Sequence, residues 1–165
     1  MLVNERFDLM KVVIVYDSVS PSRITAFVAE TVHGVLKQRG LEVDSFFVED
    51  VDKVAVKNYD CLLAGAPTMR FRVSSRMRQF LDGLSNKDFS GKLAAAFDTQ
   101  VQSRFSASAA KGIEGKLKSL GFKMVTAPLI VYVDGKLREN TWHLKEGEPE
   151  KVEKWAQGVA EALLR

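Results

Sequence analysis

The 165-residue chain has little of what several classes of protein require. Its one cysteine, Cys61, has no partner for an internal disulfide and no neighbours at metal-ligand spacing. The two histidines, His33 and His143, lie far apart in the sequence, so a metal enzyme is not expected. No apolar run approaches the roughly 18 residues of a membrane span, and the amino end lacks a secretory signal pattern. We therefore expect a cytoplasmic protein with no membrane partner.

The charge is mildly basic, with a formal net charge of +3 and a pI near 9.0. Such a balance fits a nucleic-acid binder, an anionic ligand or an acidic partner protein. Interleaved stacking aromatics and a recognised nucleic-acid-binding motif are missing, so nucleic acid is not expected as a partner. Hydrophobic residues make up 46% of the chain, which is enough for the core of one domain.

Apolar runs typical of buried strands alternate along the chain with apolar stripes of helical period. Strands are expected over residues 11–16, 43–48, 59–64, 92–97 and 122–133, the last interrupted by Pro128. Helices are expected over 24–40, weakly over 51–56, around 77–84, over 108–120 and from Pro149 onward. Five strands separated by helices predict a parallel sheet with helices on both faces. In such a sheet with strand order 2-1-3-4-5, a ligand binds between the carboxyl ends of the first and third strands. The loops to consider are therefore 17–23, 66–74 and 98–106.

The first loop places three hydroxyls, Ser18, Ser20 and Ser22, at alternate positions beside the amino end of a helix. Free backbone N–H groups and the helix dipole make such a place a natural anion site, and Arg23 could add a full charge. A purely structural reading is that Ser20 caps the helix and Pro21 occupies its first position. The sequence contains neither a Walker loop nor the G-x-G-x-x-G fingerprint of pyrophosphate binding.

Two motifs resemble a known family. Residues 15–18 (Val-Tyr-Asp-Ser) and 20–23 (Ser-Pro-Ser-Arg) resemble the FMN-phosphate loop of flavodoxins and of the flavodoxin modules in flavodiiron proteins. Residues 65–68 (Gly-Ala-Pro-Thr), followed by 77–82 (Met-Arg-Gln-Phe-Leu-Asp), are similar to flavodoxins and to flavodoxin-like NAD(P)H:quinone oxidoreductases. The resemblance implies an α/β fold, a flavodoxin-like three-layer sandwich over residues 10–165, with residues 1–9 as an N-terminal extension. It also implies FMN as the cofactor.

The cofactor-binding residues expected from the loops and the resemblance form three groups. They are Ser18, Ser20, Pro21, Ser22 and Arg23; then Pro67, Thr68, Met69, Arg70 and Phe71; then Thr99, Gln100, Arg104 and Phe105. Gly65 and Pro67 are expected to bend the chain away from the sheet. Phe71 could stack on the flavin, and Arg70 or Arg72 could meet an anionic reduced flavin or a nicotinamide phosphate. No residue is assigned a catalytic role.

The sequence therefore predicts an FMN-binding redox protein, with FMN rather than FAD because no pyrophosphate fingerprint is present. It leaves open electron transfer and NAD(P)H-dependent reduction of a flavin or quinone. The arginines near the loops, including Arg76 and Arg78, favour NAD(P)H or an acidic redox partner. The alternative is a flavodoxin-like binding module that has lost flavin and binds another phosphate-bearing ligand or a partner. Pro21, Arg23 and a glycine-free third loop favour this alternative. Trp142 and His143 follow an Asp134-Gly135 turn, where a hairpin is expected.

Overall fold

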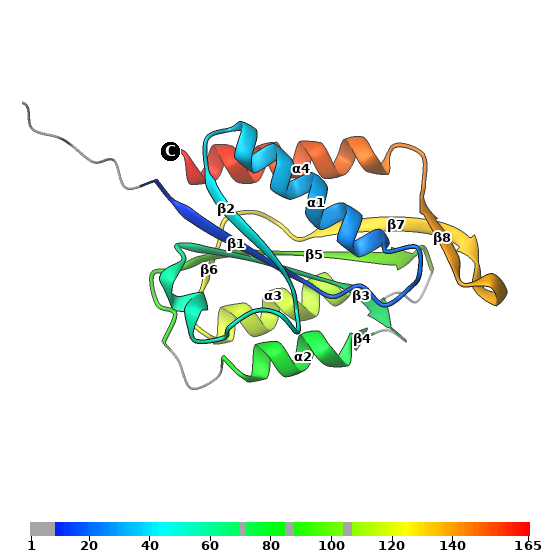
Figure 1. The fold of residues 1–165 in the computed structure, drawn as a ribbon, viewed down its shortest axis with the longest axis horizontal. Coiled ribbons are helices and arrows are strands. Elements are labelled where there is room, and N and C mark those ends of the chain that lie inside the picture. The colour runs from blue at the N-terminus through cyan, green and yellow to red at the C-terminus, as the bar shows by residue number, and fades with distance from the viewer. Residues whose placement is uncertain (1–8, 70–71, 85–87, 104–106) are drawn as a thin grey trace, which may run out of the picture.

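The computed structural model describes residues 9–69, 72–84, 88–103 and 107–165. Figure 1 shows a twisted sheet between two layers of helices. Helices α1 (Ile24–Gln38) and α4 (Glu148–Leu163) cover one face, and α2 (Ser75–Asp82) and α3 (Ala109–Ser119) cover the other. The predicted three-layer α/β sandwich is therefore confirmed. Among the described residues, no helix is both long and apolar enough to cross a membrane.

Five parallel strands form the centre of the sheet. They are β1 (Lys11–Tyr16), β2 (Glu42–Phe47), β3 (Cys61–Met69), β5 (Leu93–Val101) and β7 (Leu129–Lys136). Their order, β2-β1-β3-β5-β7, is the predicted order 2-1-3-4-5. Three short strands enlarge the sheet: β4 (Arg72–Val73) and β8 (Thr141–Leu144) are antiparallel to β3 and β7, and β6 (Lys123–Met124) is parallel to β5.

The continuous apolar run of β1 is explained by its two buried faces. Val12 and Ile14 belong to the core beneath α1 and α4, whereas Val13 and Val15 belong to the core beneath α2 and α3. All four side chains are fully buried. Because alternate residues of a strand face opposite sides, a strand covered by helices on both faces must be apolar at every position.

Strands β3 and β5 are longer than predicted. They continue past Ala64 and Phe97 and pair with each other as far as Pro67 and Thr99. The expectation that Gly65 and Pro67 bend the chain away from the sheet is therefore wrong. A Cβ at Gly65 would lie 2.0 Å from a ring carbon of Phe97, so glycine leaves space for that ring. Pro67 lies beyond the last pairing with β1, where β3 has become an edge that tolerates proline.

Smaller differences lie elsewhere in the chain. The weak helix expected over 51–56 is a 3-10 turn at Ala55–Asn58. The last predicted strand is divided around Pro128 into β6 and β7, as expected. The hairpin expected near Trp142 is present, but it turns at residues 137–140, while Gly135 pairs with Trp142 inside the ladder.

Candidate functional site

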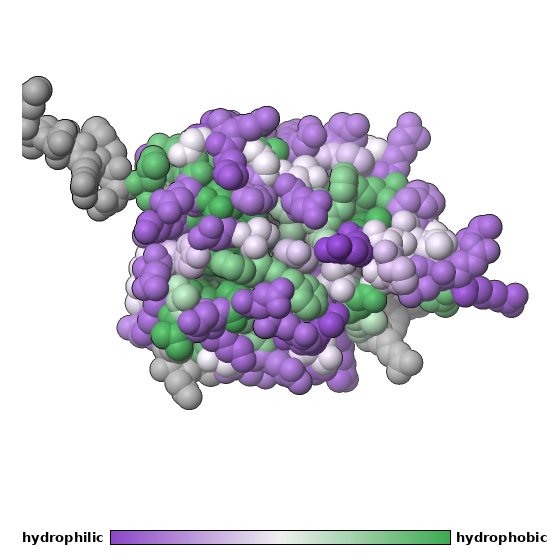
Figure 2. Space-filling model, in the orientation of Figure 1, coloured by the Kyte–Doolittle hydropathy of each residue, from purple (hydrophilic) through white to green (hydrophobic). Residues whose placement is uncertain are grey.

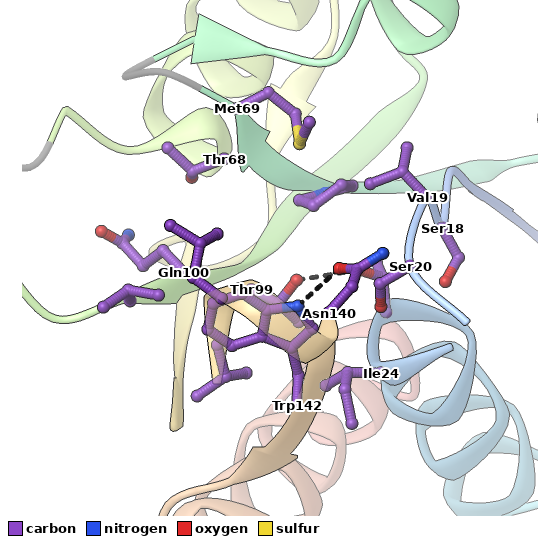
Figure 3. A pocket seen from close by; sticks show the side chains of 15 residues that line it. Ser18, Val19, Ser20, Ile24, Thr68, Met69, Thr99, Gln100, Asn140 and Trp142 are labelled. Carbon is purple, nitrogen blue, oxygen red and sulfur yellow. Dashed lines mark hydrogen bonds between the residues drawn. The ribbon is translucent and has the colours of Figure 1, made fainter. Parts of the chain in front are cut away.

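A cavity of about 390 Å³ lies at the carboxyl ends of β1, β3 and β5 (Figure 3). Its walls are the β1–α1 loop, the first turn of α1, the ends of β3 and β5, and the β7–β8 hairpin. The lining residues are Ser18, Val19, Ser20, Ile24, Thr25, Pro67, Thr68, Met69, Thr99, Gln100, Val101, Val133, Leu137, Asn140 and Trp142. This is the switch point at which the topology predicts a ligand, and its volume is within the range of small-molecule sites.

Ser18 and Ser20 line the cavity beside the amino end of α1. The N-cap of this helix is Arg23, in a left-handed conformation (φ 51, ψ 41), and its side chain makes no capping hydrogen bond. The reading in which Ser20 caps the helix is therefore wrong. The amino end of α1 keeps the positive end of its dipole and its N–H donors for an anion.

The other predicted residues of this loop lie outside the cavity lining. Pro21 and Arg23 are exposed. The Ser22 hydroxyl accepts a hydrogen bond of 2.9 Å from the backbone N–H of Trp142. Ser22 thus joins the loop to the β7–β8 hairpin, although the two residues are 120 positions apart in the chain.

An ion pair fixes the beginning of the same loop. The carboxylate of Asp17 is fully buried and lies 2.8 Å from Nη2 of Arg76, the second residue of α2. Arg76 also donates to the Ser18 carbonyl at 3.4 Å, approaches Glu49 at 3.7 Å and lies 5.0 Å above the Phe47 ring. Arg76 therefore neutralises a buried negative charge one residue before the serines and ties the loop to α2.

A buried polar network lies behind the ends of β3 and β5. The fully buried Asp98 carboxylate accepts hydrogen bonds from Ser108 Oγ (2.6 Å), Ala110 N (3.1 Å), Gln100 Nε2 (3.1 Å) and Thr68 Oγ1 (3.3 Å). These bonds fix the amino end of α3 and the orientation of the Gln100 amide. The Gln100 Oε1 atom is also buried, yet it has no hydrogen-bond donor in the described structure.

This arrangement fits FMN. One end of the cavity offers serine hydroxyls and a helix amino end, which suit a terminal phosphate. The rest is lined mainly by apolar side chains, which suit a flat ring system. Gln100 lines the cavity, but its amide is bonded to Asp98 and its unpartnered Oε1 is buried away from the cavity space.

Seven of the fourteen predicted residues line this cavity: Ser18, Ser20, Pro67, Thr68, Met69, Thr99 and Gln100. Arg70, Phe71, Arg104 and Phe105 lie outside the described residues. Sequence reasoning missed Asp17, Thr25, whose hydroxyl lies 2.8 Å from that of Thr99, and the hairpin residues Leu137 and Asn140. The sequence analysis places Trp142 in the hairpin but assigns it no role in the site.

A second, more open hollow lies between β4, α2 and α3. Three cations line it, Arg72, Arg78 and Lys111, together with Val73, Ala107, Ser108 and Gly112. None of the three forms an ion pair with another described residue. Arg72 and Arg78 thus lie beside this basic groove and are absent from the lining of the main cavity.

The fold and the site together define a flavodoxin-like α/β protein. The family model for NADPH-dependent FMN reductase matches residues 10–135, and the chain belongs to this family. It is 30% identical over 92 residues to a flavodoxin from Clostridium saccharobutylicum; the matched part covers 54% of this chain and 56% of that protein, little more than half of its length.

Solved structures agree on the fold. The oxidised flavodoxins 1 and 2 from Bacillus cereus have TM-scores of 0.77 and 0.78 at 20% and 24% identity, covering 92% of this chain and 97% and 98% of theirs. The rubredoxin oxygen:oxidoreductase from Desulfovibrio gigas has a TM-score of 0.76 at 21% identity, over 93% of this chain and 36% of that one. The family and the fold support an FMN-binding redox function, and the flavin-free binding module is not favoured.

Proposed function

We propose that the protein holds FMN in the main cavity and transfers electrons, either as a carrier or as an NAD(P)H-dependent reductase of a flavin or quinone. One observation carries the proposal. The cavity at the switch point has the side chains of Ser18 and Ser20 and the amino end of α1 on one side, and the rest of its lining is largely apolar. When bound, FMN supplies the electron chemistry, because it accepts and donates one or two electrons. The protein then needs no nucleophile or general base of its own.

Each part of the cavity has a role in this proposal. Ser18, Ser20 and the amino end of α1 bind the phosphate. The strand ends at 67–69 and 99–101 border the rest of the nucleotide. Ser22 positions the hairpin, and Arg23 attracts the phosphate from a greater distance. The contacts of Pro21, Arg70, Phe71, Arg104 and Phe105 with FMN remain predictions.

Identification of the bound flavin tests the cofactor. The protein should be yellow, and chromatography of the flavin released by denaturation should give FMN. Recovery of FAD, or failure to bind added FMN at micromolar concentration, would refute the proposal. The serine loop offers a site for one terminal phosphate and no pyrophosphate fingerprint, which is the reason to expect FMN.

The phosphate role of the serines can be measured separately. Each neutral hydrogen bond contributes about 1 kcal/mol, so the double variant Ser18→Ala/Ser20→Ala should bind FMN about 30-fold more weakly. Riboflavin, which lacks the phosphate, should bind with nearly unchanged affinity. Ser119→Ala, at the far end of α3, is a matched control that removes an exposed hydroxyl. Equal losses for both ligands would show that the loop does not contact the phosphate.

We infer that the electron donor approaches the basic groove and is NAD(P)H or an acidic redox protein. Three cations on three elements, none of them in an ion pair with a described residue, favour an anionic donor. Charge reversal in Arg72→Glu/Arg78→Glu should slow reduction by such a donor at low ionic strength without releasing FMN. Added salt should narrow the difference, because exposed charges are screened. Arg39→Glu, on the helix layer opposite the groove, is the control. Unchanged rates of reduction at low salt would show that the donor does not bind at the groove.

A further inference from the structure

The β7–β8 hairpin extends the five-strand core and brings a tryptophan to the cavity. Strand β8 runs back along β7, and the hairpin end projects from the molecule as a hydrophilic extension (Figures 1 and 2). The backbone N–H of Trp142 bonds to the hydroxyl of Ser22, two residues before α1. A segment near the carboxyl end of the chain thus forms one wall of the cavity.

One hydrogen bond holds the backbone of Trp142, a second holds its indole, and Gly135 leaves space for the ring. Its backbone N–H donates to Ser22 Oγ at 2.9 Å, and its Nε1–H donates to Asn140 Oδ1 at 3.0 Å. Asn140 adopts the left-handed conformation (φ 49, ψ 38) that ends the turn. Gly135 lies opposite Trp142, and a Cβ there would be 2.8 Å from an indole carbon. The indole therefore rests on bare backbone, with its side-chain donor satisfied inside the hairpin.

Trp142 lines the cavity, and because its Nε1–H is already bonded to Asn140, the indole needs no hydrogen bond from a ligand. Figure 3 shows it near Thr99, Asn140 and Ile24, on the side of the cavity away from Met69. A fixed aromatic side chain loses little conformational freedom when a ligand packs against it, which favours binding. An aromatic wall contributes to affinity through its contact with apolar or planar groups. A phosphate gains nothing comparable from it.

We propose that Trp142 packs against the non-phosphate part of the bound flavin nucleotide, and that Ser22 positions it for this contact. The inference rests on the proposed function. It assigns affinity for the organic part of the ligand to the hairpin and affinity for the phosphate to Ser18 and Ser20. Trp142 and the serines should therefore affect different ligands.

The test compares FMN and riboflavin binding to full-length variants. Trp142→Ala should weaken both ligands about tenfold and by the same factor. Trp142→Phe, which keeps an aromatic face, should stay within about threefold of wild type. The matched control is Trp155→Phe, because Trp155 lies on α4, donates its Nε1–H to the Ala127 carbonyl and packs edge-on against Phe97. This control should bind both flavins as wild type does. Circular dichroism verifies that each variant is folded. If Trp142→Ala is unfolded, Trp142→Leu, which keeps an apolar side chain but removes the aromatic face, replaces it and should weaken both ligands by the same factor.

The positioning role of Ser22 gives a second measurement. Ser22→Ala should weaken FMN and riboflavin equally, and the effect of Trp142→Ala should be smaller in that background, because both changes disturb one contact. Wild-type affinity in Trp142→Ala would overturn the inference while leaving the proposed function intact. So would a loss confined to FMN in Trp142→Ala or Ser22→Ala. Failure of the wild type to bind either flavin would instead refute the proposed function.

Discussion

Replacing Arg76 with leucine should destabilise the protein strongly, because it removes the cation beside a fully buried carboxylate. Asp17 is 0% exposed, and its ion pair with Arg76 is 2.8 Å long. Breaking a buried pair by removing one partner costs about 3–5 kcal/mol. The Arg76 side chain is 35% exposed, so water reaches its side of the pair and the lower end of this range applies. A loss of about 3 kcal/mol lowers Tm by roughly 6–12 °C in a domain of this size.

The reciprocal change separates the ion pair from packing. In Asp17→Asn the buried group is neutral, and Arg76 keeps Glu49 at 3.7 Å and its exposure to water, so the loss should be about 1 kcal/mol. The double variant Arg76→Leu/Asp17→Asn leaves no unpaired buried charge. It should therefore cost at least about 1 kcal/mol less than the sum of the two single changes.

Urea unfolding of the FMN-free protein near pH 7, followed by circular dichroism, measures all three variants without the stabilisation that a ligand adds. Lys118→Leu is the control, because Lys118 is 60% exposed and pairs with Glu114 only at the surface; its loss should be below about 1 kcal/mol. The reasoning would be refuted if the losses in unfolding free energy of the two single variants summed to that of the double variant. It would also be refuted if Arg76→Leu lost no more unfolding free energy than Lys118→Leu. Arg76→Leu should also weaken FMN more than riboflavin, since it leaves a carboxylate unneutralised beside the serine loop.

Three further predictions concern the scaffold. Gly65→Ala should cost about 3 kcal/mol in chemical unfolding, and Phe97→Leu in the same chain should recover part of it, because the added Cβ would lie 2.0 Å from that ring. Burial, assisted by the charge of Asp60, raises the pKa of the Cys61 thiol to about 12. A thiol reagent at pH 8 should therefore label it only after unfolding. Because its folded pKa lies above the unfolded value of 9.0, its contribution to stability is full below pH 9 and should be lost as pH rises from 9 towards 12. A chain that begins at Met10 should keep the Tm and the flavin of the full chain, whereas a drop of several degrees would show that residues 1–9 pack on the domain.

The sequence predicts the five central strands and their order well, because a strand buried on both faces must be a continuous apolar run. It fails where β3 and β5 end. Residues such as Thr68 and Gln100 are polar, and a local reading assigns them to loops. In the structure the two strands continue because they pair with each other beyond the point where β1 leaves the sheet. Tertiary pairing thus overrides local propensity there.

The same limit explains the missed parts of the site. The serine loop and the ends of β3 and β5 follow predicted strands, so the topology alone brings them together. The bond between Arg76 and the Ser18 carbonyl spans 58 positions, and the bond between Trp142 and Ser22 spans 120. No local pattern in the sequence encodes either contact. The hairpin was expected, but its return to the start of α1 depends on three-dimensional twist.

The distribution of bonded and unbonded polar groups indicates which kind of ligand suits the proposed site. Asp98, Ser22 and the Trp142 indole N–H are each bonded within the protein, and Asp17 is neutralised by Arg76. Ser18 and Ser20 are half-buried and line the cavity, whereas Gln100 Oε1 is buried and has no hydrogen-bond partner in the described structure. Two hydroxyls beside a helix amino end can donate to an acceptor that carries negative charge. Together with the largely apolar remainder of the cavity, the serines suit a ligand that joins an anionic group to a mostly apolar body. FMN has this combination, while inorganic phosphate lacks the body and riboflavin lacks the anion.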